Sequence, residues 1–418
     1  MYQAKRMLVF HSAYTFEDIK KLGLEIFVQS RDAGNFFEKI LTVSPVASLQ
    51  YQPEDPRQIS SPEFFQLDDR NLVLEGRLAQ FHFLKRFRIL NFLLAQVTLI
   101  ITLLRKGKLQ EVELIRGEDP RFNGLYAYIA SRFLRKPLVI GLWGNPGRIR
   151  NLNGKPIAPR LFPTMYLEEK VETFILKHAD IVLAQNIENM SYALQKGVEL
   201  GKTRITPLGV GIDKVHYLSL SNRLDISSDL ETLQIGEEFL LFCISRLEAL
   251  KMVDHAIRAC AVLKDAQISF KLVLIGEGRE RNNLEKLTSE LGLAGNVIFA
   301  GNRSQSWIAG LMSHADLNVA PLCGRALLEA SLSGCPAVSY DVDWHDEIVH
   351  TGVTGELVEN LNFVAMGEAA KKILLDDQLR ADMREKMFKL AHELASPSRI
   401  TEEQVKIYSD LIQKRRSK

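Results

Sequence analysis

Two cations follow an apolar segment closely in ISRLEALK (244–251). Arg246 and Lys251 are five positions apart across a predicted turn, so both side chains can converge on one anion. A guanidinium that binds through two parallel hydrogen bonds and a compact ammonium together suit a diphosphate. The spacing alone leaves a second interpretation open, in which both cations are solvated at the surface.

A glycine pair follows the next predicted strand, in LIGEGRER (274–281). Gly276 and Gly278 allow a tight strand-to-helix turn and the close approach of a ligand. The third glycine of the dinucleotide fingerprint is missing, so the pair is a weak signal for NAD and disfavours a hydride-transfer enzyme.

The stretch VAPLCGRALLEASLSGCPAV (319–338) predicts the end of a strand, a short turn and an apolar helix. Gly324 and Arg325 precede that helix, whose free N–H groups and dipole suit a second phosphate. Glu329 lies one turn into the helix, where its carboxylate can accept two hydrogen bonds from a vicinal diol such as ribose. Alternatively, Glu329 only stabilises the helix dipole.

These side chains need a sheet that brings several strand ends together. Short apolar runs alternate with longer amphipathic ones along the whole chain, which is typical of βα units and a parallel sheet, so the fold class is α/β. In the first half, strands are predicted over 7–12, 111–117, 137–144, 180–185 and 204–209, with a long polar loop over 145–163. In the second half, strands are predicted over 239–245, 271–277, 296–301, 317–322 and 336–341.

The length of 418 residues predicts two domains. We expect an N-terminal domain over 1–216, a linker over 217–237, a second domain over 238–397 and a C-terminal helix over 398–418 that packs back on the first domain. Two doubly wound domains would place their strand ends on either side of a cleft, which suits a ligand that has two parts.

The composition excludes several classes of protein. Hydrophobic residues at 46% and charged residues at 25% are ordinary for a globular chain, and a net charge of +2 gives no sign of nucleic-acid binding. The four cysteines lie in apolar surroundings without CxxC spacing, so we expect reduced, buried thiols and no metal site. The start, MYQAKRMLVF, has too short an apolar run for a signal peptide, and we expect a cytoplasmic location.

One apolar segment, residues 89–104, has basic residues on both sides. It is too short and too often interrupted by polar residues to span a bilayer. A buried helix that packs on a sheet is the favoured interpretation. The alternative is a surface for a membrane or a lipid acceptor, because FHFLKRFRIL (81–90) interleaves aromatics and cations as interfacial segments do.

From about residue 239 to 395 the chain resembles the nucleotide-sugar domain of GT-B glycosyltransferases, specifically family 4. The resemblance rests on SRLEALK for the G-R-L-x-x-x-K motif, on LVLIGEGRERNNLEKLTSELGLAGNVIFAG, on ALLEASLSGCPAVSYD and on DEIVHTGVTGELV (346–358), all in the family's order. It implies two Rossmann-like, doubly wound domains that face a cleft, the GT-B fold.

The resemblance also implies roles for particular residues. Arg246 and Lys251 would hold the diphosphate of a UDP- or GDP-linked donor and stabilise its charge as it leaves, and Glu329 would bind the ribose hydroxyls. The donor would further contact Gly276, Gly278, Asn302, Arg303, Gly324, Arg325, Ala326, Leu327 and Leu328, with Asn302 and Arg303 near the base. Members transfer with retention of configuration and generally without a bound metal or cofactor.

Two departures from the family pattern concern the transferred sugar. The first glutamate of the family's acidic pair should fall at Pro321, and a loop shortened by about four residues would explain its loss. Trp143 stands where members commonly have a histidine. Candidate acceptor-side residues at predicted strand ends are His11, Arg116, Asp119, Trp143 and Asn145.

The sequence therefore predicts a retaining, metal-independent glycosyltransferase of cell-surface or secreted glycan assembly. Its partners would be a nucleotide-sugar donor and a glycan or lipid-linked acceptor, with contact to the inner face of the membrane as an added expectation. Two alternatives stay open: a nucleotide-sugar-binding scaffold without turnover, and a nucleotide-sugar epimerase of the same architecture.

Overall fold

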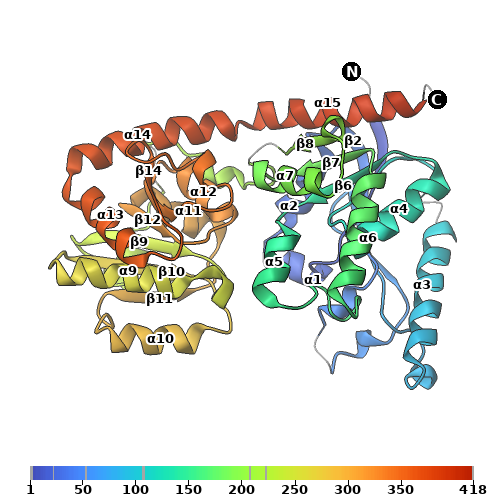
Figure 1. Ribbon diagram of the computed structural model, residues 1–418, viewed down its shortest axis with the longest axis horizontal. Helices are drawn as coiled ribbons and strands as arrows, with labels where there is room; N and C mark the ends of the chain where they lie inside the picture. The colour runs from blue at the N-terminus through green and yellow to red at the C-terminus, as the bar shows by residue number, and fades with distance from the viewer. Residues whose placement is uncertain are drawn as a thin grey trace. The chain divides into compact units, whose positions relative to one another are not determined.

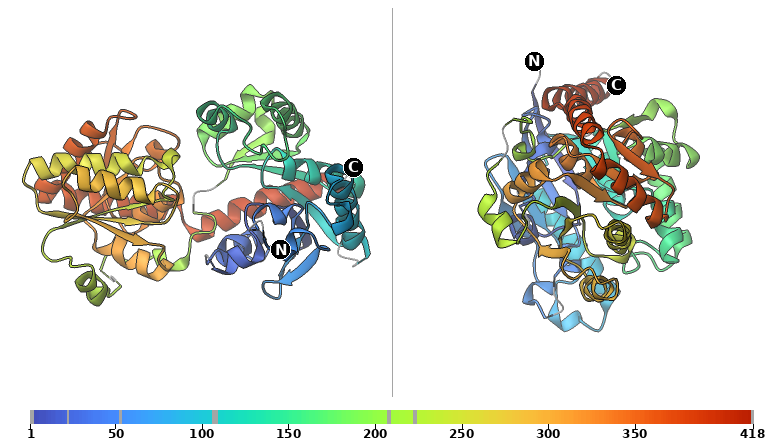
Figure 2. Two further views of the ribbon diagram at one scale, coloured as in Figure 1. Left: turned by 90° about the horizontal axis from the view of Figure 1, so that it is seen from below. Right: turned by 90° about the vertical axis from the view of Figure 1, so that its left-hand side faces the viewer.

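The computed structural model describes residues 3–21, 23–51, 54–105, 109–206, 209–221 and 224–416. The chain divides into two compact units, one formed by Met1–Gly211 with Pro397–Lys418 and the other by Ile212–Ser396. Each unit is a parallel sheet with helices on both of its faces, as Figures 1 and 2 show. The prediction of two Rossmann-like, doubly wound domains is confirmed.

The described part of the first unit contains one eight-stranded sheet in the order β3-β4-β2-β1-β5-β6-β7-β8, in which only β3 is antiparallel to its neighbour. Its strands are β1 (Ala4–Phe10), β2 (Phe37–Ser44), β3 (Glu63–Gln66), β4 (Asn71–Glu75), β5 (Val112–Gly117), β6 (Leu138–Leu142), β7 (Ile181–Ala184) and β8 (Thr203–Ile205). Its helices are α1 (Phe16–Lys21), α2 (Glu25–Gln29), α3 (Arg88–Arg105), α4 (Phe122–Leu134), α5 (Pro146–Asn153), α6 (Met165–His178), α7 (Ile187–Gln195) and α15 (Pro397–Arg416).

The last helix, α15, covers part of one face of this sheet. Tyr408 and Ile412 are buried there against Met7 of β1 and Leu114 of β5. Because both faces of the central strands are covered, residues 7–10 of β1 and the whole of β6 are apolar rather than alternating.

The described part of the second unit contains a six-stranded parallel sheet in the order β11-β10-β9-β12-β13-β14. The strands are β9 (Phe239–Ile244), β10 (Phe270–Ile275), β11 (Val297–Gly301), β12 (Leu317–Ala320), β13 (Ala337–Tyr340) and β14 (Gly355–Val358). The helices are α8 (Ser227–Thr232), α9 (Val253–Asp265), α10 (Arg281–Glu290), α11 (Gln305–His314), α12 (Arg325–Leu332), α13 (Phe363–Leu375) and α14 (Asp377–Leu394).

The segment predicted as a linker, 217–237, is part of the second unit instead, and the chain passes between the units at Gly211 and Ile212. Ile226 is buried in the core of the second unit, and the Tyr217 hydroxyl donates to the Ala395 carbonyl at 2.9 Å. The segment has no clear periodicity because it is irregular except for the short helix α8, and not because it connects two domains.

Two further predictions about the first unit are wrong. The sequence analysis missed β2, β3 and β4; exposed Glu38 and Lys39 interrupt the start of β2, and β3 is a short edge strand. The predicted loop over 145–163 contains α5, whose Arg150 is buried and binds Glu172 through two hydrogen bonds of 3.0 and 3.1 Å. This internal ion pair stabilises a helix in a stretch without apolar periodicity.

The favoured interpretation of 89–104 as a buried helix is also wrong. In α3 the buried positions follow one narrow stripe, Asn91, Ala95, Leu99 and Leu103, with Gln96 beside it. Much of the rest of the helix surface is exposed.

Candidate active site

The order of the second sheet defines a point where the winding reverses. The chain proceeds from β9 outward to β10 and β11, and then returns to the other side of β9 to form β12, β13 and β14. Ligands of open α/β sheets bind beside such a reversal, at the carboxyl ends of the two strands concerned. Here the end of β9 carries the loop 245–251, which contains Arg246 and Lys251. The end of β12 carries the loop 321–324, which leads into α12 and its expected phosphate-binding start.

Arg246 and Lys251 both lie in the loop after β9. Burial lowers the pKa of Lys251, and Cys323 partly offsets this effect. The positive charge of Arg246 lowers the same pKa further, so each cation acts electrostatically on the other. Within the described residues, neither side chain makes a hydrogen bond or an ion pair with the protein. Arg246 is exposed and Lys251 is half-buried, and the charge of Asp343 also acts on Lys251. No described carboxylate lies within ion-pair distance of either cation, an arrangement that an anion would complete.

The glycine pair serves this same loop. A Cβ atom on Gly276, whose φ is +131°, would lie 2.1 Å from the Ser245 carbonyl oxygen, and one on Gly278 would lie 2.2 Å from that of Leu247. The close approach allows the Leu247 N–H to donate to the Glu277 carbonyl at 3.0 Å. The two glycines therefore hold the loop that carries Arg246, whatever they contribute to ligand binding.

Gly276→Ala is expected to destabilise the second unit by about 2–3 kcal/mol, because it adds a clash with backbone atoms to a strained φ. Gly295→Ala is the matched control, since a Cβ there meets nothing within 4 Å. Urea unfolding followed by circular dichroism compares the two variants. Equal unfolding midpoints would contradict the role of Gly276 in packing the two loops.

Glu329 is almost fully buried in α12, 5% exposed, and is not alone. Its Oε1 accepts a hydrogen bond from the Arg325 Nε at 2.9 Å, an ion pair across one helical turn. Arg325 thus already has a carboxylate partner, and Oε2 of Glu329 is the oxygen that this bond leaves for a ligand. Gly324 precedes the helix without a side-chain cap, and a Cβ on it would meet nothing within 4 Å.

The loop after β12 consists of four residues, Pro321 to Gly324, with Pro321 buried. Buried groups from the neighbouring strand fix this loop. The Ser339 hydroxyl donates to the Ala320 carbonyl at 2.6 Å, and the ring nitrogens of His345 lie 2.7 Å from Ser339 Oγ and 3.0 Å from the Cys323 carbonyl oxygen. Sequence reasoning did not identify His345, because its partners come from separate segments of the chain.

The predicted base-side residues follow β11, at the edge of the sheet. Asn302 and Arg303 are exposed, and Arg303 donates to the Ala300 carbonyl at 2.9 Å while its guanidinium stacks on Trp307. With neighbouring strands about 4.8 Å apart, β11 lies roughly 10 Å from β9. That separation fits a ligand whose diphosphate and base lie at opposite ends.

The first sheet also reverses its winding, between β1 and β5, and a cluster of charged side chains lies there. Glu118 follows β5 and is buried, with Oε1 at 3.2 Å from the Nε atoms of both Arg31 and Arg116. The Trp143 indole N–H donates to Glu118 Oε2 at 2.7 Å, and Arg116 donates to the Tyr408 hydroxyl at 2.9 Å. We call these five residues the Glu118 cluster.

Charges in the cluster determine which groups are ionised. Burial would raise the pKa of Glu118, but Arg116 and Arg31 outweigh it and lower that pKa to about 2. Burial, followed by the charge of Arg31, lowers the pKa of His11 to about 3. At neutral pH the cluster therefore contains two guanidiniums, one carboxylate and, beside them, a neutral imidazole.

The structure brings together three of the five acceptor-side candidates, His11, Arg116 and Trp143, around the Glu118 that sequence reasoning missed. Arg116 is 4% exposed, and its guanidinium is bound to Glu118 and Tyr408.

The other two candidates have local structural roles. Asp119 accepts the Arg121 N–H at 2.8 Å and binds Asn123. Asn145 caps α5 and donates to Glu188 at 2.9 Å.

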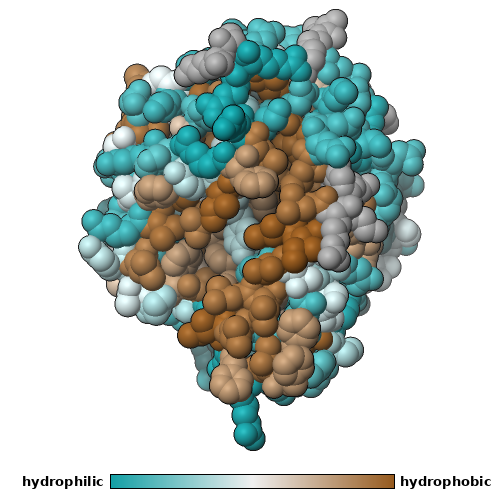
Figure 3. Space-filling model, turned by 90° about the vertical axis from the view of Figure 1, so that its right-hand side faces the viewer, coloured by the Kyte–Doolittle hydropathy of each residue, from teal (hydrophilic) through white to brown (hydrophobic). Residues whose placement is uncertain are grey.

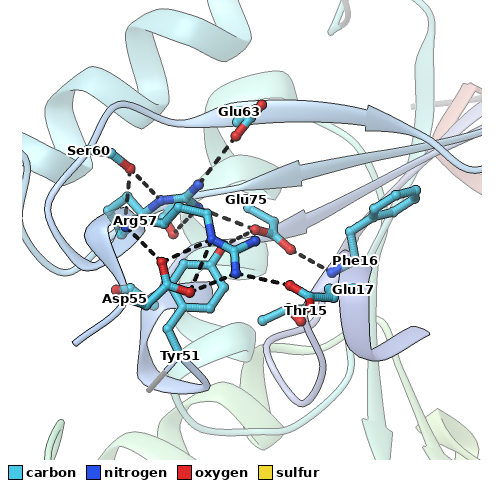
Figure 4. A network of polar contacts seen from close by, with 12 residues as sticks. Thr15, Phe16, Glu17, Tyr51, Asp55, Arg57, Ser60, Glu63 and Glu75 are labelled. Atoms are coloured by element: carbon cyan, nitrogen blue, oxygen red, sulfur yellow. Dashed lines mark hydrogen bonds and ion pairs between the residues drawn. The ribbon is translucent and has the colours of Figure 1, made fainter. Parts of the chain in front are cut away.

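A second polar network lies where β4 ends, around buried Glu75 (Figure 4). Glu75 accepts hydrogen bonds from the Tyr51 hydroxyl and, at 2.6 Å, from the Phe16 N–H. Arg57 binds Asp55 and Glu17 beside it, at 2.6 and 2.9 Å. The network connects the loop after β1 to the loop before β3, so two loops at this edge of the sheet are held rigidly.

Two doubly wound parallel sheets in one chain, with charged side chains where each winding reverses, are the architecture of GT-B glycosyltransferases. Residues 227–390 match the family described as Glycosyl transferases group 1. The chain is 24% identical over 270 residues to alpha-D-kanosaminyltransferase of Streptomyces kanamyceticus, covering 62% of this chain and 67% of that protein. It is 26% identical over 173 residues to poly(glycerol-phosphate) alpha-glucosyltransferase of Bacillus subtilis, covering 40% of this chain and 25% of that one.

A solved structure extends the likeness to nearly the whole chain. HepE of Anabaena, crystallised with UDP, superposes with a TM-score of 0.70 at 19% identity, over 98% of this chain and 100% of that one. The family match lies within the second unit, and both units have the fold of GT-B glycosyltransferases, so the predictions of a GT-B glycosyltransferase and of an enzyme are confirmed.

Proposed function

We propose that the protein is a family 4 glycosyltransferase that moves a sugar from a UDP- or GDP-linked donor to an acceptor with retention of configuration. The observation that carries this proposal is the pair Arg246 and Lys251, two cations without a carboxylate partner among the described residues, at the reversal point of the second sheet. HepE, which shares the fold, was crystallised with UDP and with UDP-glucose, and this supports a nucleotide-sugar donor.

In the proposed mechanism, the protein itself stabilises the leaving diphosphate. Negative charge develops on the diphosphate as the bond to the sugar breaks, and the half-buried Lys251 together with the exposed Arg246 would lower the energy of that state. Among the described residues, His, Cys, Asp and Glu side chains form no group of three or more that could hold a metal ion. By the family resemblance of the second domain, we expect Arg246 and Lys251 to do the work that a divalent cation does in other enzymes, without a cofactor.

The acceptor would bind mainly to the first unit, near His11 and Trp143 at the reversal point of its sheet. We expect a glycan or lipid-linked acceptor of cell-surface or secreted glycan assembly, and an enzyme that works in the cytoplasm, peripheral to the inner face of the membrane.

The test is to incubate the protein with a panel of UDP- and GDP-sugars, with and without candidate acceptors, and to measure the nucleoside diphosphate released. Release that depends on one donor, together with the anomeric configuration of the product by NMR, would support the proposal. Nucleotide binding without turnover across the panel would contradict it and favour a scaffold that only binds the donor.

Glu329→Gln is expected to weaken the binding of free UDP or GDP by about 10-fold to 100-fold, because it replaces a charged acceptor of ribose hydrogen bonds. Arg325→Ala is the control: it breaks the same ion pair but keeps the carboxylate and the backbone N–H groups. Isothermal titration with each nucleotide gives the affinities. If both variants lose affinity equally, the ion pair matters rather than a bond from Glu329 to the ribose.

A further inference from the structure

The outward side of α3 is apolar along its whole length. Ile89, Leu93, Val97, Ile100 and Leu104 recur at helical spacing, and each has between 47% and 79% of its surface exposed. We call these five residues the α3 apolar face; Phe83 and Phe87, just before the helix, are 78% and 63% exposed. Figure 3 shows apolar side chains gathered on this side of the first unit. An apolar area this continuous is unusual on a surface in contact with water only.

The polar side chains of α3 form their hydrogen bonds within the protein. Asn91 accepts the N–H groups of residues 80 and 81, and Gln96 binds the Arg77 carbonyl and the Tyr126 hydroxyl. Thr98 and Thr102 donate to carbonyl groups one turn earlier in the helix, at 3.0 and 2.8 Å. The helix can therefore present its outward side to a non-polar medium without leaving these groups unsatisfied.

The acidic and basic side chains of the segment 76–110 all have the same sign. The sequence contains no Asp or Glu from 76 to 110, while Lys85, Arg86 and Arg88 precede the helix core and Arg105, Lys106 and Lys108 follow it. Lys85, Arg86 and Arg88 are exposed. Cations at the border of an apolar face are complementary to anionic lipid head groups.

We propose that the α3 apolar face docks on an anionic lipid bilayer, with α3 lying in the plane of the interface. No helix among the described residues is long and apolar enough to cross a membrane, so α3 would lie on the bilayer and not span it. A second copy of the chain is a poorer occupant, because a symmetric contact between two such helices would bring only cations together, without an acid in the segment to neutralise them.

The proposal names the partner of one surface of the first unit and requires no particular donor. It agrees with a lipid-linked acceptor but rests on α3 alone, so it can fail or hold separately from the proposed function.

The test measures co-sedimentation of the full-length protein with vesicles of phosphatidylcholine, and with vesicles of equal parts phosphatidylcholine and phosphatidylglycerol. The face variant is Leu93→Glu with Val97→Glu. The matched control is Val364→Glu with Leu375→Glu, a valine and a leucine of similar exposure on α13 of the other unit. A charge variant replaces Lys85, Arg86 and Arg88 with serine.

We expect the wild type and the control to bind the anionic vesicles. The face variant should bind them more weakly by about tenfold, or by a larger factor. The charge variant should lose the preference for phosphatidylglycerol, and added salt should weaken binding of the wild type. Release of nucleoside diphosphate should be equal in the face variant and the wild type without vesicles, because α3 lies outside the donor residues.

Equal vesicle binding by the face variant and the control would overturn the proposal. A second pair of results would also overturn it: the wild type forms a dimer in vesicle-free solution that the face variant does not form, and the wild type does not bind vesicles. The α3 apolar face would then be the contact with a second copy of the chain.

Discussion

Lys251→Ala is expected to lower the rate of sugar transfer by about 100-fold or more, and Arg246→Ala by a similar factor. Removing one preorganised charge from a partly desolvated site typically costs two to three orders of magnitude in kcat. Lys251 is half-buried at the reversal point of the second sheet, and its pKa is lowered by burial and by Arg246, as expected for an ammonium whose anionic partner is a ligand. The measurement is kcat from the release of nucleoside diphosphate at saturating donor.

Lys386→Ala, which removes an exposed cation of α14, is the control and should leave the rate unchanged. Lys251→Arg keeps the charge with a different shape and should retain more activity than Lys251→Ala. Near-wild-type rates in both alanine variants would refute the assignment of the diphosphate site. A rise in KM alone would mean that the two cations bind the donor equally before and during the reaction.

Glu118→Gln is expected to destabilise the first unit by about 3–5 kcal/mol, because it leaves Arg31 and Arg116 buried without their carboxylate. Both guanidiniums are less than 5% exposed and cannot turn toward water without disrupting the sheet edge. Urea unfolding gives the loss of stability, and peptide-level hydrogen exchange should show faster opening of β1 and β5. Glu199→Gln is the control, since its side chain is 76% exposed and its ion pair with Lys202 lies at the surface of the same unit.

The same carboxylate predicts how the first unit responds to acid. The pKa of Glu118 is about 2 in the folded protein and about 4.3 in an unfolded chain, so the unfolded state binds the proton first as the pH falls. Its contribution to stability is complete above the unfolded pKa and is lost between about pH 4 and pH 2. Glu118→Gln should remove this part of the acid sensitivity. If wild type and variant lose stability in parallel over that range, the ion pairs of Glu118 do not stabilise the fold.

Much of the fold could be predicted because it depends on local pattern. Apolar runs and amphipathic stretches alternate as βα units require, and most of the predicted strands correspond to strands of the structure, for example 239–245 to β9 and 271–277 to β10. In the missed strand β2, exposed Glu38 and Lys39 follow buried Phe37 and interrupt the apolar pattern.

The donor site was predictable for a related reason. In a parallel sheet, a residue that follows a strand lies at one known edge, so Arg246, Lys251 and Glu329 could be assigned to that edge from their positions alone. Contacts between side chains could not be predicted from the positions of residues along the chain. The ion pair that joins Glu329 to Arg325 and the fixation of the loop after Pro321 by His345 required coordinates.

The amino-acid sequence by itself determined the α/β class and the presence of two domains, and it assigned the candidate diphosphate residues to one sheet edge, because each follows from periodicity or from order along one strand and its loop. Only the tertiary structure decided the Glu118 cluster, whose members Arg31, Glu118, Trp143 and Tyr408 come from distant segments that meet through sheet order and the packing of α15. The tertiary structure also determined which side of α3 faces outward. A helix with apolar residues on all its sides and only a few polar ones among them contains little local signal of which face will be covered, and the position of its neighbours selects the buried stripe.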